Sequence, residues 1–130
     1  MHRLDADRWV GALFAAWRTA DPDAAAALFT EEAEYRSHPF RAPRSGRTAI
    51  AEYWRRATET QDRLDLHVGT PLVDGDRVAV EWWVSMEDDG EESVSTGSLF
   101  LTFDGELCRS LRETWIETDG RLDPYDGWGR

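Results

Sequence analysis

The sequence predicts a single α+β domain in which helices cover one face of an antiparallel sheet. Two observations carry this prediction. Apolar residues recur at helical spacing in the first half of the chain, and in the second half they alternate at strand spacing. The chain has 130 residues, which is the size of one domain, so we expect a single domain over residues 1–130.

Three helices are expected in the first half. Asp5–Arg18 places its large apolar side chains on one helical face. Asp21 and Pro22 supply an N-cap and a first-turn proline for a short helix over Ala24–Phe29. A loop from His38 to Gly46 follows, and Ser45 is the expected cap of a third helix from Arg47 to Thr60.

One short strand and a four-stranded meander complete the prediction. The short strand is Ala33–Ser37, between the second and third helices. The meander strands are joined by turns that pair an acidic residue with glycine, and they are Leu64–Val68, Arg77–Glu87, Ser93–Phe103 and Leu107–Glu117. Residues from Arg121 onward form an irregular tail, in which Trp128 is either a lid residue or part of a disordered end.

Composition excludes several classes of function. The net charge is −11, with 26 acidic and 15 basic residues, which disfavours binding to nucleic acid or to an anionic membrane. No apolar run is long enough for a membrane span and no signal peptide is visible, so we expect a cytoplasmic protein. All basic residues are Arg and Asn is absent, which favours a GC-rich bacterial source.

The sequence predicts neither a metal site nor a cofactor. The three His are scattered along the chain, and Cys108 is the single cysteine. No glycine-rich phosphate loop and no nucleophile elbow are present.

A family resemblance covers nearly the whole chain. It is carried by Ala24-x3-Leu28-Phe29-x3-Ala33-x-Tyr35, His38-Pro39, Ser45-Gly46-Arg47-x2-Ile50-x3-Trp54, Val78-Ala79-Val80-Glu81-Trp82, and a last strand ending in Trp115. In order and spacing these segments resemble the nuclear transport factor 2-like superfamily, which includes the SnoaL-like polyketide cyclases and the ketosteroid isomerases. The resemblance implies a cone-shaped sheet whose concave face is covered by three N-terminal helices. It does not imply one activity, because this fold carries enzymes, binding modules and scaffolds.

Alignment to the ketosteroid isomerases implies which side chains face the pocket. The predicted ligand contacts are Trp17, Tyr35, Trp54, Trp83, Leu99, Leu101, Leu111 and Trp115. The same alignment turns Arg36, His38, Glu81 and Glu113 inward, with Leu13, Ala79, Ser85 and Gly97. Trp82 and Arg112 are expected on the outer sheet face, where a homodimer would form. A slip of one residue would turn a whole strand set outward.

The resemblance implies four catalytic candidates. His38 falls where the isomerases carry their proton-shuttling Asp, and its pKa suits an acid or base, although a lone His in a loop is often a structural hydrogen-bonding group. Glu81 and Glu113, if both face inward, would form an acid–base pair oriented by Arg36. The structural alternative is an ion pair of Arg36 with one carboxylate, or carboxylates that face solvent. The aromatic residues are likewise either ligand walls or plain core.

Departures from the family pattern argue against two of the activities found in the family. Leu13 stands where the isomerases carry an oxyanion-hole Tyr, and Val94–Phe103 contains no carboxylate. Both argue against steroid isomerisation by that mechanism. The acid of the SnoaL-like cyclases would fall near Ile116, which weakens that assignment too.

Two functions are therefore open. The first is a cofactor-free isomerase, dehydratase or cyclase that acts on a small apolar molecule with His38 as base or acid. The second is a non-catalytic ligand-binding or dimerisation module. A cavity on the order of several hundred Å³ that holds His38 and a carboxylate would favour the enzyme, and an interior filled by Trp rings would contradict it.

Overall fold

The computed structural model describes residues 1–130 and contains three helices. Helix α1 (Arg3–Arg18) begins at His2, whose side chain accepts a hydrogen bond from the Leu4 amide. Asp21 caps α2 (Pro22–Ala26) through the Ala24 amide, as predicted. Helix α3 (Arg47–Glu59) begins at Gly46 without a side-chain cap, so the prediction that Ser45 caps it is wrong.

The seven strands form one mixed, open sheet. They are β1 (Phe29–Arg36), β2 (Arg44–Ser45), β3 (Gln61–Val68), β4 (Leu72–Asp74), β5 (Arg77–Asp88), β6 (Glu91–Asp104) and β7 (Leu107–Asp119), in the order β2-β1-β7-β6-β5-β3, with β4 beside β5. The predicted meander is present in β5, β6 and β7. Strand β1 runs parallel to β7, so the sheet is not wholly antiparallel. Strand β1 also starts at Phe29, a residue predicted to end the second helix.

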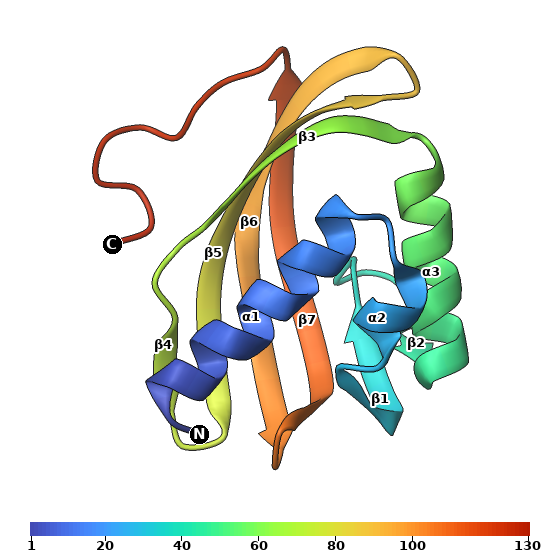
Figure 1. Ribbon diagram of the computed structural model, residues 1–130, viewed down its shortest axis with the longest axis vertical. Coiled ribbons are helices and arrows are strands. Elements are labelled where there is room, and N and C mark those ends of the chain that lie inside the picture. Colours follow the sequence, from blue (N-terminus) through green and yellow to red (C-terminus); the bar gives the residue numbers. More distant parts are fainter.

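The helices lie on one face of the curved sheet, as predicted. In Figure 1, α1 crosses in front of the long strands and α3 stands beside the β1 edge. The core between the two layers is large and apolar, and its fully buried side chains include Leu13, Phe29, Tyr35, Ile50 and Leu111. No helix has both the length and the apolar character needed to cross a bilayer.

Strand β5 shows which face of the sheet is inward. Its buried inner set is Val78, Val80, Trp82, Val84 and Met86. The predicted inward set (Ala79, Glu81, Trp83 and Ser85) is one residue out of phase and lies on the outer face. The predicted place of Trp82 on the outer face is wrong for the same reason. On β6 and β7 the predicted phase is correct, because Leu99, Leu101 and Leu111 belong to the core.

The C-terminal segment, residues 120–130, packs on the outer face of the sheet and does not cover a pocket. The carbonyl oxygen of Leu122 accepts hydrogen bonds from Trp83 Nε1 at 2.7 Å and from Ser85 Oγ at 3.1 Å. The rings of Tyr125 and Trp128 contact the Trp83 ring edge to face. This cover explains why Trp83 and Ser85 are buried although they face away from the helices.

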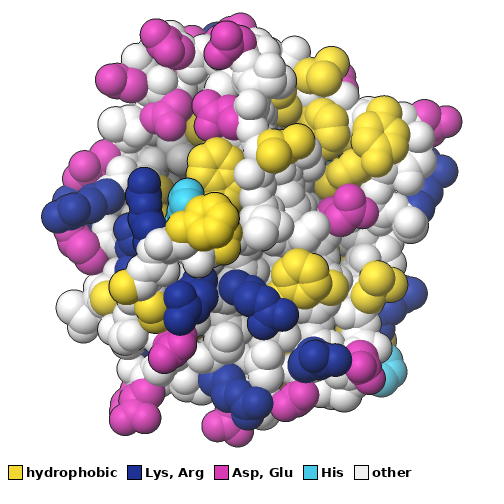
Figure 2. All heavy atoms as spheres, turned by 180° about the vertical axis from the view of Figure 1, so that it is seen from behind, with side chains coloured by type: hydrophobic (Ala, Val, Ile, Leu, Met, Phe, Trp, Pro, Cys, Tyr) yellow, Lys and Arg dark blue, Asp and Glu magenta, His cyan; other side chains and the backbone are white.

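The rest of the outer face carries apolar side chains among charged ones (Figure 2). Leu72, Phe100 and Ile116 are exposed there, and the Arg112 guanidinium lies over the Phe100 ring. The predicted homodimer through this face stays a prediction. Its expected anchor, Trp82, lies inside the molecule instead.

Candidate functional site

A cavity opens between the helices and the inner face of the sheet. Its volume is about 140 Å³, which is below the 300–1,000 Å³ typical of drug-sized ligands and close to the size that holds one benzene ring. Every layer of the fold contributes to the lining: Trp17, Tyr35, Tyr53, Trp54, Ala57, Gln61, Trp82, Val84, Met86, Asp88, Ser93, Ser95, Glu113, Trp115 and Glu117. The fold therefore leaves room for a ligand of about one ring.

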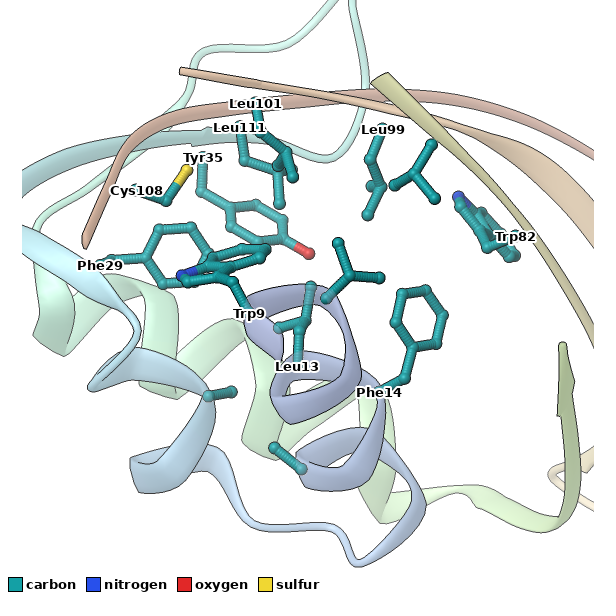
Figure 3. Close-up of a cluster of buried hydrophobic side chains, with 14 of the residues drawn as sticks. Trp9, Leu13, Phe14, Phe29, Tyr35, Trp82, Leu99, Leu101, Cys108 and Leu111 are labelled. Atoms are coloured by element: carbon teal, nitrogen blue, oxygen red, sulfur yellow. The ribbon is translucent and has the colours of Figure 1, made fainter. Parts of the chain in front are cut away.

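Three tryptophans form a continuous aromatic wall. The Trp17 ring lies edge to face with Trp54 at 5.6 Å and with Trp82 at 5.7 Å between ring centroids. The Trp17 Nε1 donates to Gln61 Oε1 at 2.7 Å, which fixes the central ring. Figure 3 shows Trp82 on the sheet, beyond Leu99 and opposite Phe14 of α1. Flat, weakly polar molecules suit such a wall.

Glu113 is the carboxyl group whose pKa departs furthest from its ordinary value. It lies on β7 opposite Leu99 of β6, so its side chain shares the inner face. Burial raises the pKa of Glu113 to about 8, and no neighbouring cation opposes the shift. At neutral pH this carboxyl group is therefore mostly protonated, and it can give up its proton within the physiological range.

Two tyrosines stand next to Glu113. The Tyr35 and Tyr53 ring centroids are 5.0 Å apart, and the Arg44 guanidinium lies 4.5 Å from the Tyr53 centroid. The hydroxyl groups of Tyr35 and Ser37 lie near the Tyr53 hydroxyl. Burial, followed by the charge of Glu113, raises the pKa of both phenols, so both remain protonated donors.

Five of the twelve predicted site residues line this cavity. Trp17, Tyr35, Trp54, Trp115 and Glu113 do so. Leu99, Leu101 and Leu111 share the inner face but are packed in the core. Trp83 is on the outer face under the C-terminal segment, so its predicted place in the pocket is wrong.

Glu81 and Glu113 lie on opposite faces of the sheet. Glu81 pairs with Ser98, which pairs with Thr114, the neighbour of Glu113. Strand β6 also lies between the two strands that carry them. Glu81 is exposed, so the predicted inward pair of carboxylates is not formed.

The side chains of His38 and Arg36 form hydrogen bonds within the loop that follows β1. His38 Nδ1 accepts a hydrogen bond from the Phe40 amide at 3.2 Å, and Arg36 Nη1 donates to the Arg41 carbonyl at 3.2 Å. Neither residue lines the cavity. Arg36 follows the inward-facing Tyr35, so alternation turns it the other way. These contacts match the structural alternative for His38, and the catalytic role predicted for it has no geometric support.

Several lining residues were not predicted. Trp82, Val84, Met86 and Asp88 were missed through the phase error on β5. The signal was present in the sequence, since every second residue from Val78 to Met86 is large and apolar, whereas the alternate positions include Arg77, Glu81 and Glu87. Gln61 and Ser93 come from strand ends, where local pattern says little about orientation.

One group outside the cavity has the donors for a divalent cation. Asp65 and His67 of β3 and Asp123 of the C-terminal segment place one ligand atom each within 4.8 Å of the others. His67 Nε2 lies 3.5 Å from Asp65 Oδ2. Imidazole with carboxylates is a common donor set for transition metals. Sequence spacing missed this group because only the packing of the C-terminal segment brings Asp123 to β3.

Comparison with known proteins agrees with this arrangement. The sequence profile of the SnoaL-like domain matches residues 10–110, most of the chain. The chain belongs to the SnoaL-like family. The superfamily predicted from sequence is thereby confirmed. A comparison with curated proteins found no match for this SnoaL-like chain.

Solved structures share the fold of this SnoaL-like protein. A protein with a ketosteroid isomerase-like fold from Catenulispora acidiphila, in complex with trimethylamine, is 23% identical with a TM-score of 0.74, over 82% of this chain and 83% of that chain. An LEH-like epoxide hydrolase of M. tuberculosis is 18% identical with a TM-score of 0.73, over 88% and 84%. The epoxide hydrolase/cyclase-like enzyme SalBIII is 22% identical with a TM-score of 0.73, over 88% and 95%. At these identities the likeness establishes the fold.

Proposed function

We propose that this SnoaL-like protein is a cofactor-free acid–base catalyst of the isomerase, dehydratase or cyclase type, in which Glu113 takes the place predicted for His38. The observation that carries the proposal is the Glu113 carboxyl group in an aromatic cavity, with a pKa of about 8. A proton carrier works best when its pKa lies near the operating pH. Because the group is protonated in the resting protein, Glu113 acts first as a general acid.

Tyr53 is the hydrogen-bond donor of the site. It lines the cavity, and burial raises the pKa of its hydroxyl group, which therefore stays protonated. A protonated phenol can donate a hydrogen bond to a substrate oxygen. Such a fixed donor stabilises charge that develops on a carbonyl or hydroxyl oxygen.

The residues that line the cavity also limit the size, polarity and charge of a substrate. The volume of about 140 Å³ admits roughly one ring, and the aromatic wall favours an apolar one. Asp88 and Glu117 also line the cavity, which disfavours an anion. Two structural relatives are named for epoxide hydrolase or cyclase chemistry. Opening an epoxide or expelling a hydroxyl group requires a proton on the leaving oxygen, which supports the same role for Glu113.

The test is turnover of small cyclic hydroxycarbonyl compounds and epoxides by wild type, Glu113→Gln and the outer-face control Glu81→Gln. We expect Glu113→Gln to lower kcat by about 10²- to 10⁴-fold and Glu81→Gln to leave it unchanged. The wild-type rate should fall as pH rises through about 8. Equal rates for Glu113→Gln and wild type would contradict the proposal. Ligand binding without turnover of any compound would favour the non-catalytic module.

A further inference from the structure

Three side chains that can ligate a metal ion meet on the outer face of the sheet, outside the cavity. Asp65 and His67 are alternate residues of β3. They pair with Ser85 and Trp83 of β5, whose side chains lie on the outer face, so both donors lie on that face too. Asp123 reaches them from the C-terminal segment, and the three ligand atoms lie within 4.8 Å of one another.

The C-terminal segment is held so that Asp123 stays over β3. In Figure 1 this segment leaves the end of β7 and turns back beside β3 and β5. Ser85 Oγ donates to the Leu122 carbonyl at 3.1 Å and accepts from the Leu122 amide at 3.2 Å. Arg121 Nη2 donates to the Arg63 carbonyl of β3 at 2.9 Å. Both residues that precede Asp123 are therefore tied to β3 or β5, so the fold itself brings the three donors together.

The imidazole nitrogen of this group has no hydrogen-bond partner. His67 Nε2 is shielded from solvent and unpaired, and a buried polar atom in this state calls for an explanation such as a bound ion. Its neighbour, Asp65 Oδ2, is 3.5 Å away. That distance is long for a hydrogen bond, whereas two ligands of a tetrahedral zinc ion, each about 2.1 Å from the metal, lie about 3.4 Å apart.

The two carboxylates of the group carry uncompensated charge. Asp65 is paired only with His67, and Asp123 forms no ion pair, although the chain contains 15 arginines. Two carboxylates this close repel each other, and a divalent cation between them removes the repulsion. Both residues are exposed, so an ion enters from solvent between the carboxylates and reaches the imidazole as they move apart.

We infer that Asp65, His67 and Asp123 bind one divalent transition-metal ion, with zinc as the best match, and that the ion fastens the C-terminal segment to β3. One imidazole nitrogen and two carboxylate oxygens supply three of the four ligands of tetrahedral zinc, and water supplies the fourth. Mg²⁺ prefers six oxygen ligands and should bind more weakly. The site goes beyond the proposed function, because Glu113 lies on the opposite face of the sheet.

The first test measures binding of the metal ion alone to the untagged protein. In isothermal titration calorimetry, Asp65→Asn, His67→Gln and Asp123→Asn should each raise the dissociation constant of Zn²⁺ by at least about 10-fold. Asp126→Asn is the matched control, since Asp126 belongs to the same segment but pairs with Arg130. Co²⁺ should give the visible absorption of a four-coordinate ion in wild type and lose it in His67→Gln.

The second test asks whether the ion fastens the segment. Zn²⁺ at about 100 times its dissociation constant should slow amide exchange of Leu122 by up to about 100-fold, because the segment then opens only after the ion leaves. The Gly46 amide, bonded to the Ala33 carbonyl at the opposite edge of the sheet, should not respond. In Asp123→Asn, zinc should leave the exchange of Leu122 unchanged.

Each alternative has its own outcome. Equal zinc affinity of wild type and the three ligand variants would overturn the inference and show an adventitious ion only. Loss of binding in His2→Gln, with binding kept in His67→Gln, would overturn it in favour of the N-terminus. Equal affinity for Mg²⁺ and Zn²⁺ would show diffuse attraction to an acidic surface and overturn it as well. Zinc binding at the three residues without slower exchange of Leu122 would support the site and overturn its fastening role.

Discussion

At the residue scale, the character of Glu113 depends on which face of the strand it occupies. The sequence contains many carboxylates, and almost all of them are exposed or paired with Arg. Glu113 differs because β7 turns it into the aromatic cavity, where burial raises its pKa to about 8. Glu81 is of the same residue type, but alternation along β5 leaves it in solvent. Side-chain direction therefore decides which carboxyl group is chemically useful.

The raised pKa of Glu113 makes stability depend on pH. Between the ordinary value near 4.5 and the folded value near 8, the folded protein binds one more proton than the unfolded chain. Stability should therefore fall as pH rises through this window, by up to about 1.4 kcal/mol per pH unit. Glu113→Gln should lack this component. Urea unfolding of both proteins from pH 5 to pH 9 measures it, and parallel curves would contradict the raised pKa.

At the scale of the elements, three neighbouring strands lie side by side at a residue without a side chain. Trp82 of β5 pairs with Gly97 of β6, and Gly97 pairs with Trp115 of β7. A Cβ atom at Gly97 would lie 2.1 Å from the Thr114 carbonyl oxygen and 2.8 Å from the Trp115 Cβ. Such a distance is possible only for glycine. The strands therefore approach closely between the two indoles, and the sheet bends around the cavity.

Gly97→Ala should consequently destabilise the protein and disturb the cavity. We expect a loss of at least about 2 kcal/mol in unfolding free energy, because the clash is with backbone atoms. Gly11→Ala is the matched control, since no atom lies within 4 Å of a Cβ there and the site is in α1. It should stabilise the protein by up to about 1 kcal/mol. Equal stabilities of the two variants would show that β6 and β7 can move apart freely.

At the scale of the whole molecule, the C-terminal segment completes the outer face. It brings Leu122, Tyr125 and Trp128 onto Trp83, and the amide of Thr70 donates to the Gly129 carbonyl at 2.7 Å. Gly69 and Gly129 touch through their backbones, with a Cβ at Gly129 placed 2.9 Å from the Gly69 Cα. The last residues are thus part of the packed structure.

Gly129→Ala should detach the end of this segment. Gly127→Ala is the control, because both glycines have positive φ angles (90° and 78°) but only Gly129 meets another backbone. We expect Gly127→Ala to cost about 1 kcal/mol of backbone strain. Gly129→Ala should in addition speed amide exchange at Thr70. Hydrogen exchange measured by NMR checks this, and unchanged protection at Thr70 would mean that the contact with Gly69 can relax.

Much of the fold could be read from local pattern. The α1 face, the Asp21 cap and the β5–β7 hairpins follow from periodicity and turn residues that act over a few positions. The parallel pairing of β1 with β7 could not be read, because it joins segments far apart in the sequence. On β5, the alternation of large apolar residues indicated the correct inner face, whereas the alignment to the family assigned the opposite set of side chains to it.

The amino-acid sequence by itself determined the α+β class, the SnoaL-like family and the residues able to build an aromatic pocket. Tertiary structure alone decided which of them meet. It placed Glu113 in the cavity, gave His38 a hydrogen bond within its own loop, and left the indole donors of Trp54 and Trp82 without partners. The physical reason is that periodicity specifies which residues share a face, whereas pKa values and hydrogen bonds depend on what packs against that face from distant segments.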